Sequence, residues 1–161
     1  FNQPLQGVTL PSSLRSLAFG LEFNQSLEGV ALPGNLQSLA FPSNEPIPLD
    51  EDGTDFNQSL ERVSLPNSLE SLTLGRSFNQ PLQGVTLPSS LRSLAFGLEF
   101  NQSLEGVALP GNLQSLAFPS NEPIPLDEDG TDFNQSLERV SLPNSLESLT
   151  LGRSFNQPLQ G

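Results

Sequence analysis

The chain has 161 residues and a formal net charge of −12, with 18 acidic residues, six Arg and no Lys, His, Cys, Met, Trp or Tyr. The lack of Cys and His excludes disulfides, thiol catalysis, the usual zinc sites and most general-base chemistry. Ser residues are frequent, but none of the usual activating bases is present, so we expect no enzyme.

Six scattered Arg residues also make nucleic acid an improbable partner, because phosphate binding needs clustered basic side chains. The longest apolar runs are only a few residues, so no membrane insertion is expected, and there is no signal-peptide pattern or initiator Met. We expect the partner to be a second copy of the chain or another protein. Because the sequence begins and ends inside a repeat, it is expected to be a window from a longer array.

The repeat opens each time with Phe-Asn-Gln, and successive openings are 22, 33, 22, 22, 33 and 22 residues apart. Residues 1–77 are identical to residues 78–154, and residues 155–161 begin a third copy. Repetition at a period of 20 to 50 residues is typical of a solenoid. We therefore predict a single solenoid over 1–161. The perfect identity fits both a young natural expansion and an engineered array.

Each unit continues as Leu, Val, Leu-Pro, Leu, Ser-Leu, then Phe or Leu, and Phe1 to Gly20 resembles the FNIP repeat. This repeat is a 22-residue variant of the leucine-rich repeat. The resemblance covers nearly the whole chain apart from two long insertions. It implies a scaffold for protein contacts, with no catalytic residues to carry over. The fold expected is all-β, a leucine-rich-repeat-like parallel β-solenoid with a longer loop on every third coil.

The first predicted feature of each coil is its Asn. An Asn repeated at one corner can satisfy backbone groups that the turn leaves unpaired, which predicts an asparagine ladder from coil to coil. Four of these Asn also match the N-glycosylation pattern N-x-S, a use that excludes burial in a ladder. The ladder residues are Asn2, Asn24, Asn57, Asn79, Asn101, Asn134 and Asn156.

Two extended stretches follow in each coil. Val8 to Leu10 is predicted to be a short extended stretch that ends at Pro11, giving the coil a second flat face. Leu14, Leu17 and Phe19 then follow the leucine-rich-repeat spacing for a strand of a parallel sheet, with Leu17 and Phe19 pointing inward.

The outward positions of this main strand carry only small side chains. Duplication of one unit explains this, as does a packing face that lets two sheets approach closely. An ice-binding face is a third possibility, although Ala stands where that role favours Thr. The residues of this possible packing face are Ser16, Ala18, Ser38, Ala40, Ser71, Thr73, Ser93, Ala95, Ser115, Ala117, Ser148 and Thr150.

Two long insertions, residues 42–55 and 119–132, interrupt the pattern with Pro and acidic residues. Closely spaced carboxylates beside Gly53 resemble part of a calcium loop, although an EF-hand alignment places Pro48 and Ser59 at two ligand positions. A solvated acidic turn is the alternative, and no other cofactor is expected. Calcium binding would favour an extracellular or cell-surface location, with the cytoplasm as the alternative. The candidate ligands are Asp50, Asp52, Asp55, Asp127, Asp129 and Asp132.

Two functions remain open. The first is a structural protein that forms an elongated rod or filament by continued stacking of coils, because open solenoid ends expose strand edges and apolar cores. The second is a leucine-rich-repeat-like module that binds a protein on its Ser, Ala and Thr strand face. That face lacks the aromatic and Arg anchors that dominate most interfaces.

Overall fold

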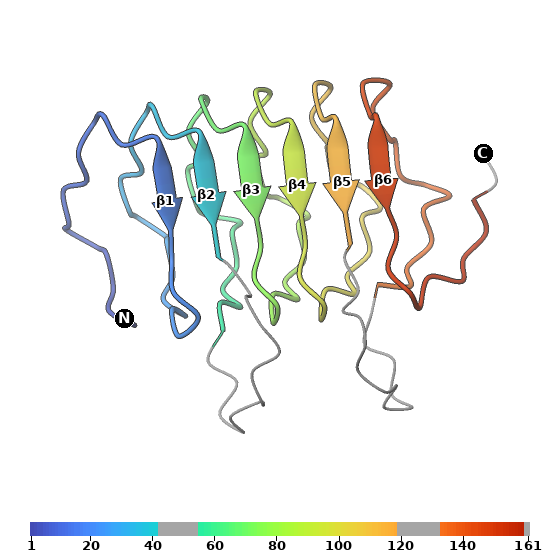
Figure 1. The fold of residues 1–161 in the computed structure, drawn as a ribbon, viewed down its shortest axis with the longest axis horizontal. Helices are drawn as coiled ribbons and strands as arrows, with labels where there is room; N and C mark the ends of the chain where they lie inside the picture. The colour runs from blue at the N-terminus through green and yellow to red at the C-terminus, as the bar shows by residue number, and fades with distance from the viewer. Residues whose placement is uncertain (42–54, 119–132, 160–161) are drawn as a thin grey trace.

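The computed structural model describes residues 1–41, 55–118 and 133–159, and these form one row of stacked coils (Figure 1). Each coil contributes one three-residue strand to a parallel sheet, and each strand pairs in register with the strand of the next coil. The prediction of a parallel β-solenoid is confirmed. The strands are β1 (Ser16–Ala18), β2 (Ser38–Ala40), β3 (Ser71–Thr73), β4 (Ser93–Ala95), β5 (Ser115–Ala117) and β6 (Ser148–Thr150).

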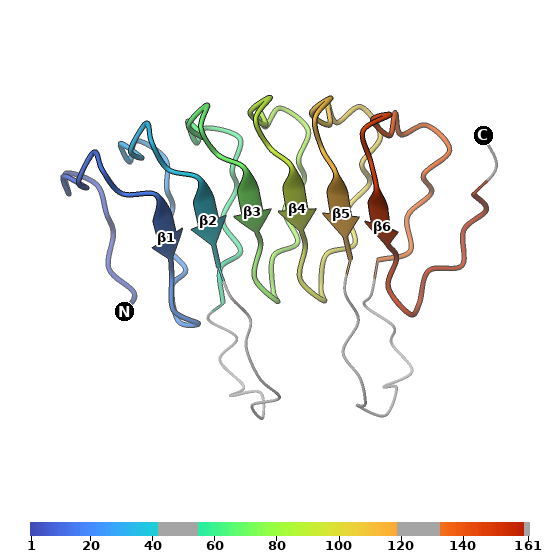
Figure 2. The same cartoon turned by 45° about the horizontal axis from the view of Figure 1, so that its top comes forward.

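We number the coils by their strands. The sheet lies on one side of the solenoid, the return segments lie on the other, and the two termini are at opposite ends of the row (Figure 2). Within the described ranges, no helix has the length and apolar character needed to cross a membrane. The coils are residues 1–22, 23–55, 56–77, 78–99, 100–132 and 133–154.

Turns close each coil at corners that the sequence marks with Leu-Pro and Gly. In the fourth coil, Leu91 donates its N–H to the carbonyl of Pro88 at 3.0 Å, and Val85 donates to Leu82 at 3.0 Å. The Leu-Pro turn recurs with the same donor and acceptor positions in all six coils. These local bonds satisfy backbone groups that stacking does not pair.

The strand alternates as predicted. In the four inner coils the central Leu of each strand is buried, and the flanking Ser, Ala or Thr are half-exposed. Because β1 and β6 each pair with one strand only, their Leu17 and Leu149 remain half-buried. The first and sixth coils therefore bury their core side chains less completely than the four coils between them.

The extended stretch predicted at Val8 to Leu10 does not form a strand. None of the corresponding segments in the described coils is a strand, and in three of them the backbone turns locally, as where Leu32 donates its N–H to Val30 at 3.1 Å. Side chains join neighbouring coils on this side instead, since the Gln83 amide donates to the carbonyls of Ser103 and Glu105. The coil thus has one sheet face and one irregular return.

Phe side chains fill one end of the core as two stacked columns. The rings that open the coils lie 6.1–6.5 Å from their neighbours, from Phe1 through to Phe155. The second column follows the strands but is interrupted: Phe19 stacks on Phe41 and Phe96 on Phe118, and the buried Leu74 stands at this position in the third coil. Stacked rings make burial in each coil depend on the coil beside it.

Candidate interaction surfaces

The Asn of every Phe-Asn-Gln lies in a continuous hydrogen-bonded ladder. The Oδ1 atom of Asn57 accepts the backbone N–H of Asn79 at 2.9 Å, and the same contact joins each neighbouring pair from Asn2 to Asn156 at 2.8–3.1 Å. The four asparagines with the N-x-S pattern are half-buried and all lie within this ladder. The contact is the one that the sequence predicts for this corner.

The Gln that follows each Asn is a further member of the ladder that was not among the predicted residues. Gln80 donates its side-chain amide to Asn57 Oδ1 at 3.0 Å, so that each inner Asn oxygen accepts two bonds from the next coil. The invariant Gln in every Phe-Asn-Gln is the signal that could have revealed this role. All of these bonds run in the same direction, from the later coil to the earlier one, and the ladder is therefore polar.

Asn79→Ala should lower the free energy of unfolding by about 1–3 kcal/mol, because the N–H of Asn101 and the side-chain amide of Gln102 lose their acceptor. Asn156 is the repeat-equivalent control, since its Oδ1 accepts no bond from the described residues. Its Asn156→Ala change should be nearly neutral. Urea unfolding of the two variants checks this, and equal losses would contradict the ladder's contribution.

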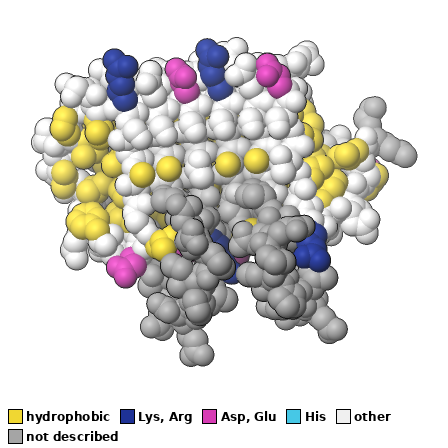
Figure 3. Space-filling view, viewed as in Figure 1, with side chains coloured by type: hydrophobic (Ala, Val, Ile, Leu, Met, Phe, Trp, Pro, Cys, Tyr) yellow, Lys and Arg dark blue, Asp and Glu magenta, His cyan; other side chains and the backbone are white. Residues whose placement is uncertain are grey.

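Small side chains cover the exposed sheet face, as the sequence predicts. Figure 3 shows this flat face with alternating basic and acidic side chains along one edge of it. This edge row is formed by the residue that precedes each strand, and four of its six residues are charged. Glu70 and Arg92, for example, are neighbours in the third and fourth coils. In chain order this row is Arg15, Gln37, Glu70, Arg92, Gln114 and Glu147.

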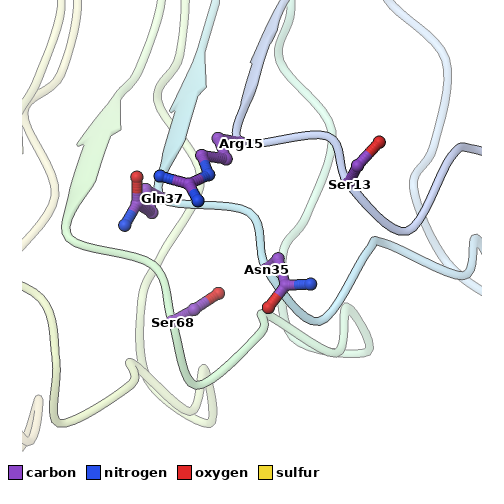
Figure 4. A pocket seen from close by; sticks show the side chains of 5 residues that line it. All are labelled: Ser13, Arg15, Asn35, Gln37 and Ser68. Atoms are coloured by element: carbon purple, nitrogen blue, oxygen red, sulfur yellow. The ribbon is translucent and has the colours of Figure 1, made fainter.

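A shallow cavity of about 380 Å³ lies at the start of this row, lined by Ser13, Arg15, Asn35, Gln37 and Ser68. The Arg15 side chain extends toward Gln37. Asn35 and Ser68 lie below these two side chains in the view of Figure 4. Ser68 donates to the carbonyl of Leu36 at 2.7 Å, and Asn35 donates to that of Ser12 at 3.0 Å. All five lining residues carry polar side chains, and those of Asn35 and Ser68 already donate hydrogen bonds within the chain.

Most of the candidate calcium ligands lie outside the described residues. These are Asp50, Asp52, Asp127, Asp129 and Asp132. The described ranges contain no group of three or more Asp, Glu, His or Cys positioned to hold a metal.

Asp55 is the described member of the candidate calcium set, and it is half-buried. Burial raises its carboxyl pKa, and the nearby Arg76 partly opposes this by lowering it. Arg76 also lies 3.9 Å from Glu99. A guanidinium at this corner competes with a cation for the same carboxylates.

The two ends of the solenoid expose what the inner coils bury. Phe1 is 69% exposed, whereas its repeat-equivalent Phe78 is 0% exposed. Leu159 is 65% exposed, whereas Leu82 is 1% exposed. Edge strands with free backbone groups and apolar surface pair readily with another chain.

The sequence of the repeat was compared with models of known protein families. The model of the FNIP Repeat matches residues 1–44, 56–99, 78–121 and 133–161. The chain belongs to the FNIP repeat family. The resemblance seen in the sequence is therefore confirmed, and with it a repeat protein of leucine-rich-repeat-like fold. A comparison with curated proteins gave no match.

The FNIP array is also similar to the crystal structure of CroV588, described as a novel circular LRR protein. The TM-score is 0.76 and the sequence identity is 41%, over 99% of this chain and 20% of that chain. The chain thus spans about a fifth of the length of the solved structure that it matches. The similarity shows that the FNIP coils stack in the leucine-rich-repeat manner.

Proposed function

We propose that this FNIP repeat chain is a non-catalytic structural protein that extends by continued stacking of coils into a rod or filament. The observation that carries the proposal is the junction between the third and fourth coils. Residues 56–77 pack there against residues 78–99, and the same two sequences form the last and first complete coils, residues 133–154 and 1–22. Residues 155–159 continue past the sixth coil, and they would have to move aside for a second copy. Two copies placed head to tail can therefore form this same junction.

The internal junction is well packed and hydrogen-bonded. Leu74 donates its N–H to Ala95 at 2.8 Å, and Arg92 donates to Glu70 at 2.8 Å. The rings of Phe56 and Phe78 stack at 6.1 Å. A second copy that makes these contacts would pair β6 with its own β1 and bury the exposed ring of Phe1.

The shape of the stack follows from the rotation between coils. A straight stack would advance about 14 Å per three-coil period, at the strand spacing of a β-sheet. The likeness to a circular leucine-rich-repeat structure supports a curved path, in which a closed ring is the other product of the same stacking. Either form leaves no open sheet edge except at the ends of a filament.

A charge-reversal cycle tests the head-to-tail contact. Stacking would place Glu147 of one copy beside Arg15 of the next, as Glu70 stands beside Arg92 within the chain. Arg15→Glu and Glu147→Arg should each weaken assembly a few-fold, because exposed pairs contribute about 0–1 kcal/mol, and the double variant should recover it. Sedimentation velocity over a range of concentrations and negative-stain electron microscopy measure this.

Monodisperse particles of one chain at every concentration would contradict the stacking proposal. Repeating the microscopy with calcium and with a chelator tests the calcium prediction, which requires the filaments to shorten when the ion is removed. Calcium would then stiffen the inserts and link neighbouring rods.

The alternative is a protein-binding module of the leucine-rich-repeat kind that uses its strand face. The polar cavity beside Arg15 and Gln37 favours this second function. Under it the chain would remain monomeric, and Arg15→Glu would weaken binding of the partner without being rescued by Glu147→Arg.

A further inference from the structure

The edge row of the sheet face is neutral as a whole, although the chain carries a net charge of −12. Each 77-residue period contributes one Arg, one Gln and one Glu to it, and Figure 3 shows the basic and acidic side chains alternating along the edge. The strand positions beside the row present Ser, Ala and Thr. Two copies of this acidic chain would therefore repel each other least where these faces meet.

Opposite charges in neighbouring coils of the edge row do not pair with each other. Arg92 donates its backbone N–H to the Glu70 carbonyl at 2.8 Å, yet the side chains of these two exposed residues form no ion pair in the described part of the chain. Arg15 also has no ion pair there. Glu147 accepts a bond from the Gln114 amide at 3.4 Å. The charged groups of the row are thus available to a partner.

A row with this order is complementary to itself when it is reversed. A half-turn about an axis parallel to the strands turns a second copy to face the first, reverses the direction of its coils and sets the two edge rows opposite each other. Arg then stands opposite Glu, and Gln opposite Gln, because Arg-Gln-Glu reads Glu-Gln-Arg in reverse. We infer that two copies of the chain pair face to face in this antiparallel arrangement. Such a two-fold interface uses the same surface on both copies.

The small side chains beside the row allow this pairing. They leave the sheet face flat over the described coils (Figure 3), so that two faces can approach and the charged side chains of the two rows can reach each other. The row also sets the register. A shift by one coil places each Arg and Glu opposite Gln or a like charge, whereas a shift by one period restores every pair. Because each period repeats the row, the pairing applies to an array of any length.

Face-to-face pairing does not require head-to-tail stacking, and different residues distinguish the two contacts. Both arrangements bring Glu147 of one copy beside Arg15 of another. Glu70 and Arg92 meet a second copy in the face-to-face pair, whereas in the head-to-tail stack they are neighbours within one chain. Glu70 and Arg92 are therefore the residues that test the pairing.

Charge reversal at these two residues provides the test in the chain of residues 1–161. Glu70→Arg places Arg opposite Arg at two symmetric points, so the concentration at which half of the chains are paired should rise roughly tenfold. Arg92→Glu should have a similar effect. The double variant restores Arg opposite Glu and should return close to the wild-type value. An equimolar mixture of the two single variants should also recover pairing, because one copy then supplies two Arg and the other two Glu.

Sedimentation velocity over a dilution series measures the pairing, and circular dichroism checks that each variant remains folded. Glu61→Arg is the matched control, since it makes the same change in net charge at an exposed position outside the row. It should leave the pairing unchanged or slightly stronger.

Three results would overturn the inference. Single variants that pair as well as the wild type would exclude the face-to-face contact and leave head-to-tail stacking unaffected. Weakened single variants that do not recover when mixed would exclude the antiparallel arrangement. A wild-type chain that stays monomeric at every concentration would exclude both kinds of association.

Discussion

Phe78→Ala is expected to lower the free energy of unfolding by about 3–5 kcal/mol, the usual cost of deleting a fully buried ring. Phe78 is 0% exposed, and its ring stacks on Phe56 and on Phe100 at 6.1 Å from each. Because each coil contacts only its neighbours, the loss falls on the junction between the two periods. Urea unfolding monitored by far-ultraviolet circular dichroism measures the change.

Phe1→Ala is the matched control, because Phe1 occupies the equivalent position in the first period. Its ring is 69% exposed and stacks on Phe23 alone, so a loss of no more than about 1 kcal/mol is expected. Amide hydrogen exchange adds a second measurement. It should show faster exchange in the third and fourth coils of Phe78→Ala, and a loss of protection confined to one terminus would contradict the stacking account.

Gly97→Ala is expected to have the second largest effect on stability. Overpacking should lower the free energy of unfolding by about 1–3 kcal/mol or more. A Cβ atom at Gly97 would collide with the carbonyl oxygen and carbon of Gly75 in the preceding coil. The atoms in the way belong to the backbone, so a rotamer change cannot relieve the contact. The two coils would have to separate at this corner, where the turn beside Gly97 meets Gly75.

Gly20→Ala is the control for this change, since Gly20 is the same position one period earlier and its Cβ would have nothing within 4 Å. The control should lie within about 0.5 kcal/mol of the wild type or be slightly more stable, because Ala reduces the entropy of the unfolded chain. Thermal unfolding of both variants distinguishes the two positions. A similar cost at Gly20 would mean that local backbone conformation, rather than the approach of the preceding coil, requires Gly.

Contrasts of this kind show why repeat identity in the sequence does not give identical environments. Phe1, Phe78 and Phe155 are followed by the same six residues, yet of the three only Phe78 has a complete coil on each side. Stacking order, which is a tertiary property, decides how much each copy contributes. The same reasoning explains why Asn79 and Asn156 are expected to respond differently to substitution.

The repeat, the position of the main strand and the alternation across it could all be predicted from the amino-acid pattern. The Leu-x-x-Leu-x-Leu spacing fixes which side chains face inward, because a strand alternates with a period of two. The Phe-Asn-Gln at every opening also predicted the asparagine corner. These features are local or strictly periodic, and they can therefore be seen without knowing which coils touch.

Features that depend on contact between coils became visible only in the folded structure. It showed that Val8 to Leu10 is no strand, and that side chains such as that of Gln83 make bonds to the next coil on this side. It also revealed the Gln donors to the ladder, the close approach of Gly97 to Gly75, and the docking of Phe155 on Phe133. Each of these requires the distance between atoms of adjacent coils, which spacing along one chain does not contain.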